Sequence, residues 1–248
     1  MNARKVLLAT LGIGVIWQLA AWLLDQNILP SPVIVLQTLF TEIGKDLGYH
    51  FAASLWRVTA SMLLSITLAA PAGLLLGQSK TLDQFFAPVI YLLYPIPKVV
   101  LVPVVLLFLG INDASKIAII FLILFFQILV LVRDQAANIT PELLYSVRSL
   151  GAGRRALFRY VYLPASVPAI LTALRQSIGT AVAVLYIVEL IATQRGLGYY
   201  IYFHGSTLFD YPKMYAGVVA MSLLGLGMYF SVDLLHRKIA PWQFGNEA

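Results

Sequence analysis

The sequence predicts an all-α membrane protein with six transmembrane helices and both ends in the cytoplasm. Of its 248 residues, 60% are hydrophobic and only 11% are charged, whereas about a quarter of the residues in soluble domains are charged. Six apolar stretches can be placed across a bilayer, which takes about 20 helical residues to cross. The net charge of +6 is therefore interpreted by its location along the chain, through the positive-inside rule, and not as a nucleic-acid-binding surface.

The first span covers residues 6–24 and follows Arg4 and Lys5, which are expected to hold the N-terminus in the cytoplasm. No A-x-A-like cleavage site follows this span, so we expect no cleavable signal peptide. Residues 25–32 form a polar exit. Residues 33–43 are apolar but too short to cross, which predicts an interfacial helix on the outer side.

The second and third spans are predicted to have different surroundings. The second, residues 55–76, has Gly73 and Gly77 near its inner end, a spacing that lets helix backbones approach closely. The third, residues 85–109, is interrupted by prolines and carries Lys98. Proline leaves backbone carbonyls without a donor, and a lysine at this depth is costly unless it is partnered or hydrated, so this span is expected to line a cavity. Its prolines are Pro88, Pro95, Pro97 and Pro103.

The last three spans are predicted at residues 117–132, 168–191 and 214–235. Glu189 lies near the outer end of the fifth span, and residues 194–211 form an external segment rich in glycine and aromatic residues. With this topology, eleven of the 17 Lys and Arg residues fall on the cytoplasmic side, five fall outside, and Lys98 lies within the membrane. This bias supports an even number of spans.

Residues 142–164, between the fourth and fifth spans, are the only long polar and basic interval of the chain. Leu143 and Val147, four residues apart, begin the apolar stripe of a short helix, and Gly151 then allows the chain to turn through a positive φ. A second amphipathic helix follows and is expected to end at Pro164, because proline disfavours the α conformation of the residue before it. The pattern predicts a cytoplasmic helix–turn–helix that docks on a partner. The alternative is a basic loop that lies on anionic lipid.

This interval resembles the cytoplasmic loop of type I importers of the ATP-binding cassette (ABC) class. The family pattern is E-A-A, three residues, G, nine residues and I-x-L-P. Gly151 stands at the glycine, and after nine further residues positions 161–164 read Val-Tyr-Leu-Pro. The opening triplet departs from the pattern, since Tyr, Ser and Val at positions 145–147 stand where Glu, Ala and Ala would be. Glu142 supplies an acid one turn earlier, and the departure removes support for a salt bridge from the first motif position.

Four other segments are similar to permeases of the nitrate/sulfonate/taurine subfamily, which extends the resemblance over most of the chain. They are residues 29–32 (LPSP), 54–58 (SLWRV), 95–98 (PIPK) and 194–199 (QRGLGY). The resemblance implies that residues 1–248 form one transmembrane permease domain. It places the type I core at about 55–240 and the coupling loop at 142–164.

The resemblance further implies a permease subunit, not an enzyme, in a bacterial or archaeal cytoplasmic membrane. It would form the translocation path of an ABC importer. ATP would be bound and hydrolysed by separate ATPase subunits, an extracytoplasmic solute-binding protein would deliver the substrate, and a second copy of the chain would complete the permease. The implied substrate is a small anionic solute of the sulfonate, taurine, nitrate or bicarbonate class, or alternatively a thiamine- or flavin-like vitamin precursor. No cofactor or metal is expected in the permease.

Three sets of residues are expected to carry this function. The coupling loop is assigned to Glu142, Tyr145, Ser146, Val147, Arg148, Gly151, Arg154, Arg155, Val161, Leu163 and Pro164. The translocation path is assigned to Pro95, Pro97, Lys98, Gln127 and Glu189. The outer gate and binding-protein contact are assigned to Arg195, Gly196, Gly198, Tyr199 and Tyr202. Lys98 suits attraction of an anion, but a structural role as partner of Glu189 explains it equally. Their offset along the membrane favours separate roles, with Glu189 bracing the outer gate.

Other function classes lack their sequence signals. The chain has no cysteine and three scattered histidines, which argues against a thiolate metal site and against a membrane-embedded enzyme with clustered His, Asp or Glu. Residues 73–81 (GLLLGQSKT) lack the glycine directly before lysine that a phosphate-binding loop requires. An ion-coupled carrier or a channel stays open as an alternative, although carriers typically have broken helices in both halves and only one proline-broken span is found here.

Overall fold

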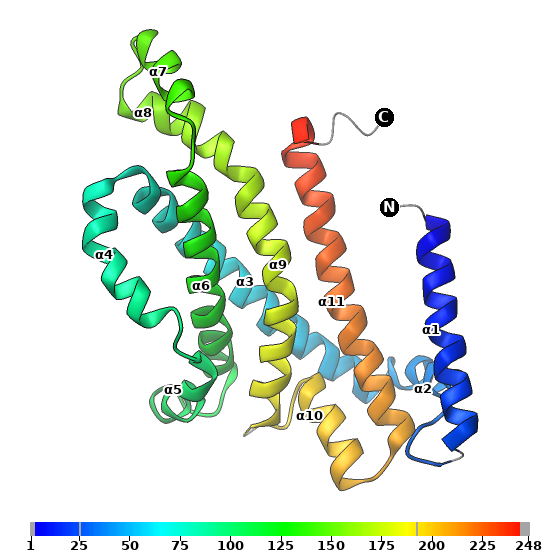
Figure 1. Cartoon of the computed structure of the whole chain (residues 1–248). Helices are drawn as coiled ribbons and strands as arrows, with labels where there is room; N and C mark the ends of the chain where they lie inside the picture. The colour runs from blue at the N-terminus through cyan, green and yellow to red at the C-terminus, as the bar shows by residue number, and fades with distance from the viewer. Residues whose placement is uncertain (1–2, 25, 192, 244–248) are drawn as a thin grey trace. The chain divides into compact units, whose positions relative to one another are not determined.

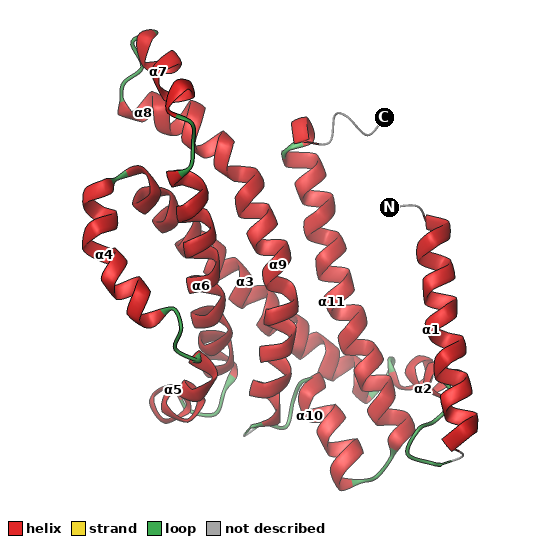
Figure 2. Cartoon of the chain, in the orientation of Figure 1, coloured by secondary structure: helices red, strands yellow, loops and turns green. Residues whose placement is uncertain are grey.

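The computed structural model describes residues 3–24, 26–191 and 193–243, apart from the side chains of residues 3, 4, 6, 7, 141 and 154. Within these residues every regular element is helical and no strand is present (Figure 2). In chain order (Figure 1) the α-helices are α1 Ala3–Leu24, α2 Pro32–Glu42, α3 Asp46–Gln78, α4 Lys80–Leu93, α5 Val102–Leu109, α6 Asp113–Ala137, α7 Pro141–Ser149, α8 Arg154–Leu157, α9 Leu163–Leu190, α10 Leu197–Tyr202 and α11 Tyr211–Ile239. Short 3₁₀-helices lie at Lys98–Leu101 and Pro241–Gln243, and π-helical turns at Phe158–Tyr162 and Phe203–Thr207.

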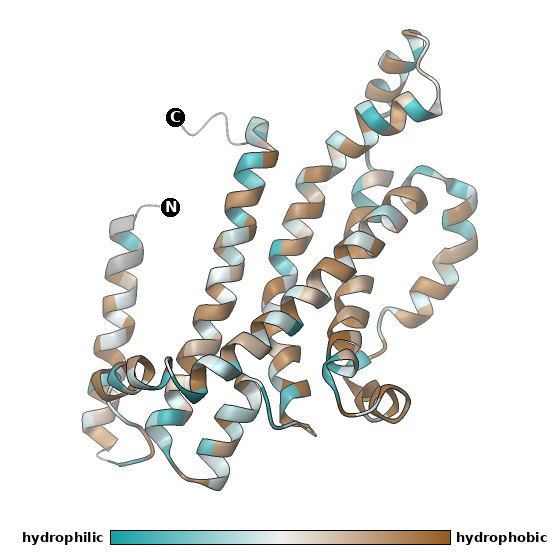
Figure 3. Ribbon diagram, turned by 180° about the vertical axis from the view of Figure 1, so that it is seen from behind, coloured by the Kyte–Doolittle hydropathy of each residue, from teal (hydrophilic) through white to brown (hydrophobic). Residues whose placement is uncertain are grey.

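Several of these helices are long and apolar enough to cross a membrane, and brown, hydrophobic residues dominate them in Figure 3. Among the described residues four qualify individually: Asp46–Gln78, Asp113–Ala137, Arg155–Leu190 and Tyr211–Ile239. A fifth span results if Lys80–Leu93 and Lys98–Leu109, which are bent by 77°, cross together. The all-α membrane architecture is confirmed. The count of six stays a prediction, because it requires the shorter apolar helix Leu8–Leu24 to cross as well.

The chain divides into two compact units. The first unit comprises Met1–Leu55 and Glu189–Leu224, and the second comprises Trp56–Val188 and Gly225–Ala248. The boundaries fall inside α3, α9 and α11, so each of these helices contributes residues to both units. The expectation that residues 1–248 form one permease domain stays a prediction.

In the second unit, α3 and α6 pack with their backbones in close contact. A Cβ atom on Gly73 would lie 2.8 Å from the Leu129 carbonyl oxygen, and one on Gly77 would lie 2.6 Å from the Ala136 Cβ. Both distances are too short for a real side chain, so glycine is required at both positions. The close helix approach predicted from this glycine pair is therefore confirmed.

A polar ladder continues the contact between α3 and α6. Ser61 donates a hydrogen bond of 3.2 Å to the Ile117 carbonyl, and Ser65 donates one of 3.3 Å to the Phe121 carbonyl. At the end of the ladder, Arg57 is 1% exposed and donates two bonds, of 2.9 and 2.7 Å, to one oxygen of Asp113. Hydrogen bonds of this kind hold helices together where no water competes for them.

The proline-rich third span is divided into α4 and α5, as the predicted interruption requires. The first part begins at Lys80, where the Ser79 hydroxyl accepts the Leu82 N–H at 3.4 Å, five residues earlier than expected from hydropathy. The chain leaves the α conformation after Tyr94, and helical structure resumes with the 3₁₀-helix that begins at Lys98. Pro95 and Pro97 lie in this gap because neither can donate a backbone hydrogen bond to extend the helix.

The expectation that Pro164 ends a helix is wrong. The chain is continuously helical from Arg155 to Leu190. A π-helical turn precedes the proline, and there the Leu163 N–H bonds to the Phe158 carbonyl, five residues back. This wider turn makes room for the proline ring. Pro164 has no N–H to donate, and it lies where the hydrogen-bond pattern changes from π-helical to α-helical, so the helix continues past it. The second helix of the loop is thus the start of the fifth span.

The first unit contains α1, α2, α10 and the adjoining parts of α3 and α11. The Trp17 indole donates a hydrogen bond of 3.2 Å to the Pro30 carbonyl, and its ring lies 5.8 Å from that of Tyr215. A Cβ on Gly217 would lie 2.8 Å from the Ile201 side chain, so α10 packs directly on the first turns of α11, beside which it lies in Figure 1. These contacts place the segment after the fifth span against the start of the sixth.

Candidate functional site

The helix–turn–helix predicted from residues 142–164 is present as α7, a turn and α8. Gly151 has φ of +82°, and its N–H donates a 2.9 Å bond to the Arg148 carbonyl, closing the end of α7. Nothing lies within 4 Å of a Cβ built on Gly151, so the conformation and not the space favours glycine. In Figure 1 this hairpin projects beyond the ends of α6 and α9, at the opposite end of α6 from α5.

Much of the hairpin's apolar surface is exposed. Tyr145 is 65% exposed, Leu150 85% and Tyr160 70%. Leu157 and Val161 are buried and hold the second helix in place. In Figure 3 the hairpin carries both teal, hydrophilic and brown, hydrophobic stretches. An exposed mixture of aromatic, aliphatic and basic side chains is typical of a surface that a protein partner covers.

The remaining predicted coupling residues also lie on this hairpin. Glu142, Ser146, Arg148, Arg155, Leu163 and Pro164 are exposed, and Val147 is half-buried. Arg154 begins α8, but its side chain lies outside the described residues.

The predicted translocation-path residues are divided between the two units. In the second unit, the Lys98 ammonium donates bonds of 2.7 Å to the Leu93 carbonyl and 2.5 Å to the Tyr94 carbonyl, and lies 4.7 Å from the centre of the Phe126 ring. Lys98 therefore supplies the donors that the proline break takes away from the end of α4. Gln127 follows Phe126 on α6 and is half-buried. Glu189 belongs to the first unit, where its described partners also lie.

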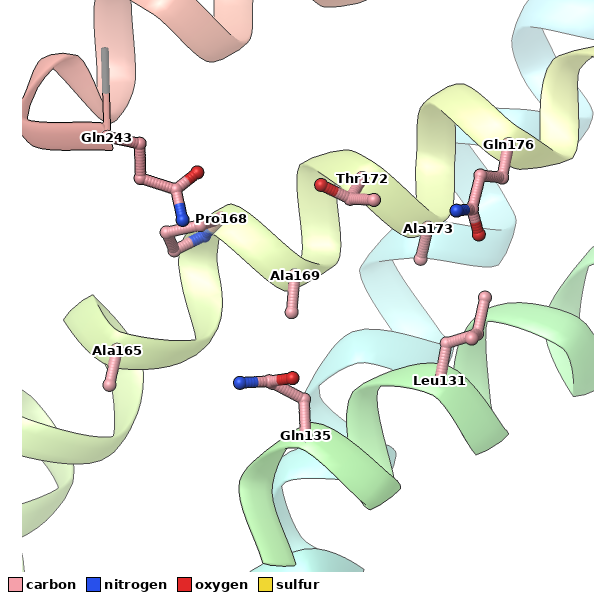
Figure 4. A pocket seen from close by; sticks show the side chains of 9 residues that line it. All are labelled: Leu131, Gln135, Ala165, Pro168, Ala169, Thr172, Ala173, Gln176 and Gln243. Carbon is pink, nitrogen blue, oxygen red and sulfur yellow. The ribbon is translucent and has the colours of Figure 1, made fainter. Parts of the chain in front are cut away.

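A polar cavity of about 300 Å³ lies in the second unit between α6, α9 and the C-terminal 3₁₀-helix. Figure 4 shows Gln135 of α6 facing the small side chain of Ala169 on α9, and Leu131 of α6 facing Ala173. These alanines leave space that a larger residue would fill. Among the described residues, the wall also carries the polar groups of Gln135, Thr172, Gln176 and Gln243 and no charged side chain. Sequence reasoning missed this cavity, because single glutamines in three separate segments form no recognisable motif.

Three consecutive backbone N–H groups of the outer turn 196–198 donate to three buried side chains. Gly196 donates to His50 Nδ1 at 3.0 Å, Leu197 to Ser54 Oγ at 2.8 Å and Gly198 to Glu189 Oε2 at 3.0 Å. Ser54 in turn donates to Glu189, at 2.9 Å from Oε1 and 2.8 Å from Oε2. The turn is thus fixed at three points by α3 and by the end of α9. We call this arrangement the outer latch.

Glu189 is fully buried, at 0% exposure, and the latch satisfies its carboxylate. Gly196 has φ of +116°, and a Cβ atom there would overlap the Glu189 carboxylate, so only glycine fits. A buried carboxylate is strongly destabilising unless it is hydrogen-bonded, so the fold depends on this turn being closed. Sequence reasoning found Glu189, Gly196 and Gly198 but missed Ser54 and His50. These two residues lie four apart on one face of α3. Their i, i+4 spacing is the sequence signal that could have identified them as a pair.

The predicted outer gate is an aromatic surface around the latch. Tyr199 stacks on His50 with ring centres 5.7 Å apart, and the Arg195 guanidinium lies 4.8 Å from the Tyr49 ring centre. Tyr202 is 51% exposed and so is accessible to a partner. Its neighbour His204 is buried 4.3 Å from the Tyr200 ring, and burial lowers the pKa of His204.

The same segment contains a backbone outlier. Phe209 has φ of +56°, a conformation that is strained for an aromatic residue, and its side chain is 64% exposed. Strain at an exposed aromatic side chain is typical of a binding surface, since folding alone gives no reason to keep it there.

Within the described residues, no group of three or more His, Cys, Asp or Glu residues is arranged to hold a metal ion. Half-buried charges form ion pairs, as in Arg175 with Asp233 at 2.9 Å and Arg133 with Asp83 at 2.9 Å.

Comparison with known proteins relates this arrangement to a family. A family model described as "Binding-protein-dependent transport system inner membrane component" matches residues 66–242. A probable ABC transporter permease protein of Brucella abortus (strain 2308) is 33% identical over 251 residues, covering 98% of this chain and 99% of that protein.

Two further relatives carry names that specify a solute. The taurine transport system permease protein of Escherichia coli (strain K12) is 30% identical over 226 residues, covering 89% of this chain and 82% of that protein. The formylaminopyrimidine transport permease protein of Halalkalibacterium halodurans is 29% identical over 232 residues, covering 92% of both. Among solved structures, a chain of an inward-facing MetNI methionine ABC transporter is similar in fold, with a TM-score of 0.67 at 19% identity, covering 76% of this chain and 93% of that one.

Proposed function

Because this chain belongs to the family of binding-protein-dependent transport inner-membrane components and is a permease of the ABC importer class, we propose that it forms the translocation path for a small sulfonate- or taurine-like solute. The family is a transport component and not an enzyme, it works in the inner membrane, and its membership implies ATPase and binding-protein partners. The proposal adds the solute, the docking surface for the ATPase and the composition of the complex.

The exposed α7–α8 hairpin is the observation that carries the coupling part of the proposal. Its turn depends on the left-handed Gly151, and its second helix runs without interruption into α9. Because the helix continues through the π-helical turn into α9, a displacement of the hairpin is passed on to the spanning helix. An ATPase subunit that docks on Tyr145, Leu150 and the neighbouring arginines would therefore move α9 directly.

The solute class is supported by the relatives, one of which is named for taurine. Lys98 supports an anionic solute only in part, because its ammonium already donates to two carbonyl oxygens. An ammonium group has three N–H donors, so one remains for a solute or water. We assign Lys98 to the path in this shared role, together with Pro95, Pro97 and Gln127.

A second candidate solute is a neutral heterocycle of the formylaminopyrimidine kind. The uncharged wall of the polar cavity favours it, because the amides of Gln135, Gln176 and Gln243 offer both donors and acceptors and no fixed charge. One relative is named for such a compound. The two candidates predict different inhibitors of uptake.

The complete importer is proposed to contain two copies of this chain, two ATPase subunits and one solute-binding protein. Both termini and the α7–α8 hairpin would face the cytoplasm, and the outer latch with residues 194–211 would face the binding protein. The basic residues of the hairpin support this orientation through the positive-inside rule.

Transport by the reconstituted complex tests the proposal. The permease is co-expressed with its ATPase, reconstituted into proteoliposomes and supplied with ATP inside and binding protein outside. ATP-dependent uptake of radiolabelled taurine that alkanesulfonates inhibit and aminopyrimidines do not would support the first candidate. The reverse pattern would support the second, and uptake of neither class would overturn both.

A further inference from the structure

The hydrogen bond from Gly196 defines the protonation state of His50. Its N–H points at Nδ1, which must therefore be an unprotonated acceptor. The proton of the neutral ring is then on Nε2, which lies 3.4 Å from the nearer carboxylate oxygen of Asp46. A second proton on Nδ1 would face the Gly196 N–H, so that two donors would meet and the bond would be lost.

We propose that His50 is a positioning residue of the transport cycle: its neutral ring holds Gly196, and with it the outer segment, in the conformation that transport needs, and protonation from the outer side releases that segment. The inference rests on the proposed outward orientation of residues 194–211. It assigns to His50 a role through the turn and not contact with the solute.

Loss of the hydrogen bond between Gly196 and His50 is expected to affect the whole latch. His50 is only 4% exposed, and the same turn places Leu197 on Ser54 and Gly198 on Glu189. Release of Gly196 therefore loosens the two adjoining hydrogen bonds and with them the partners of a buried carboxylate. Bonds in one network strengthen one another, so losing the first weakens the rest.

The groups around His50 come from every element packed against it. Asp46 and Tyr49 lie on α3, Tyr199 and Tyr200 on α10, and Arg195 in the preceding turn. Glu189 of α9 is linked to the ring through the latched turn. His204 adjoins Tyr200, and burial lowers the pKa of His204. Lys213 and Asp210 lie near His204.

Asparagine provides a sharp test, because its Oδ1 occupies nearly the place of Nδ1 and accepts a hydrogen bond but does not titrate. Uptake is measured in proteoliposomes with the inner pH held at 7.5 and the outer pH set at 7.5 or 5.5. For the unmodified importer we expect uptake at outer pH 5.5 to fall below that at pH 7.5, because a proton on Nδ1 removes the acceptor that holds Gly196. His50→Asn should keep most of the uptake at pH 7.5 and lose the dependence on outer pH.

Two further variants complete the test. His50→Leu, which has no acceptor, should show low uptake at both outer pH values. His236→Asn removes a histidine of the second unit and, whatever its absolute rate, should keep the unmodified ratio between the two pH values. Co-purification with the ATPase establishes assembly of each variant, and the affinity of the binding protein for the solute is measured separately at both pH values.

Amide hydrogen exchange gives a readout that needs no transport. At pH 5.5 the amides of residues 196–198 should exchange faster in the unmodified chain than in His50→Asn at the same pH, and the two should agree at pH 7.5. A His50→Asn variant that follows the unmodified pH profile, or equal exchange of the two chains at pH 5.5, would overturn the role of His50. Absence of uptake at pH 7.5 with every solute would instead count against the proposed function, while the exchange result would still decide the latch.

Discussion

At the scale of single residues, several charged and glycine residues lie where specific contacts require them. Glu189 is fully buried and depends on donors from Ser54 and Gly198. Gly196 is required twice, by its positive φ and by the carboxylate that leaves no room for a Cβ. Lys98 completes the end of a broken helix. The contribution of each of these contacts to stability or transport can therefore be measured with a single substitution.

Replacement of Gly196 by alanine is expected to open the latch. The new Cβ must displace the Glu189 carboxylate and must adopt a strained φ, which together should lower the free energy of unfolding by about 1–3 kcal/mol or more. The melting temperature of the purified complex and ATP-driven uptake should both fall. Gly179→Ala on α9 is the matched control, because nothing lies within 4 Å of its Cβ and its φ is ordinary. Equal behaviour of the two variants would contradict the latch.

Replacement of Lys98 separates its charge from its length. Lys98→Met removes the donors to Leu93 and Tyr94 and the positive charge, so uptake should be abolished while assembly and basal ATPase activity persist. Lys98→Arg keeps the charge and several N–H donors and should preserve part of the uptake. Initial uptake rates of the three proteins decide the matter. Normal transport by Lys98→Met would remove Lys98 from the translocation path.

At the scale of elements, two connections in the second unit bear on the proposed coupling. The α3–α6 pair is held rigid by glycine contacts and by the serine ladder. The α7–α8 hairpin is exposed and joins α9 through a π-helical turn. A rigid pair beside a connected, exposed hairpin is the arrangement expected if the hairpin receives the displacement and α9 carries it inward.

Replacement of Gly151 by valine is expected to uncouple ATP hydrolysis from transport. A β-branched residue at φ of +82° is strained by about 1–3 kcal/mol, and the end of α7 must rearrange to relieve it. ATPase co-purification and the ratio of solute transported to ATP hydrolysed are the measurements. Gly153→Val is the control, since Gly153 lies in the same turn with equal space and without a positive φ. If Gly151→Val transports with the unmodified ratio, the hairpin is not the coupling element.

At the scale of the whole molecule, the number of spans and their orientation are the main open expectations. Four helices qualify as spans, a bent pair adds a fifth, and only a crossing by α1 gives six with both termini on one side. The chain has no cysteine, so single introduced cysteines report their side of the membrane without background.

Labelling of single cysteines with a membrane-impermeant maleimide is expected to give opposite results for the two faces. Gln26→Cys and Tyr202→Cys should react from outside, because both lie in predicted external segments. Lys5→Cys and Ser146→Cys should react only after the membrane is opened, because both lie on the predicted cytoplasmic side. Labelling of Lys5→Cys and Gln26→Cys from the same side would show that α1 does not cross and that the span count is five.

The sequence by itself determined the class of the protein and much of its element order. Long apolar stretches with few charges predict membrane helices, and the spacing from Gly151 to Pro164 predicts the position of the hairpin. Both features depend only on residues that are close together in the chain. The prolines around Lys98 indicated a broken span for the same reason. The end of the second hairpin helix was predicted wrongly, since a local rule about proline cannot foresee a π-helical turn.

Only the tertiary structure decided which distant residues meet. His50 and Ser54 reach the turn 196–198 across more than 140 positions, and Arg57 reaches Asp113 across 56. The four polar groups of the cavity likewise come from three separate segments. Periodicity describes the faces of one helix, but the partner of each face depends on how helices pack. The outer latch therefore became visible only when α3, the end of α9 and the glycine turn were placed together.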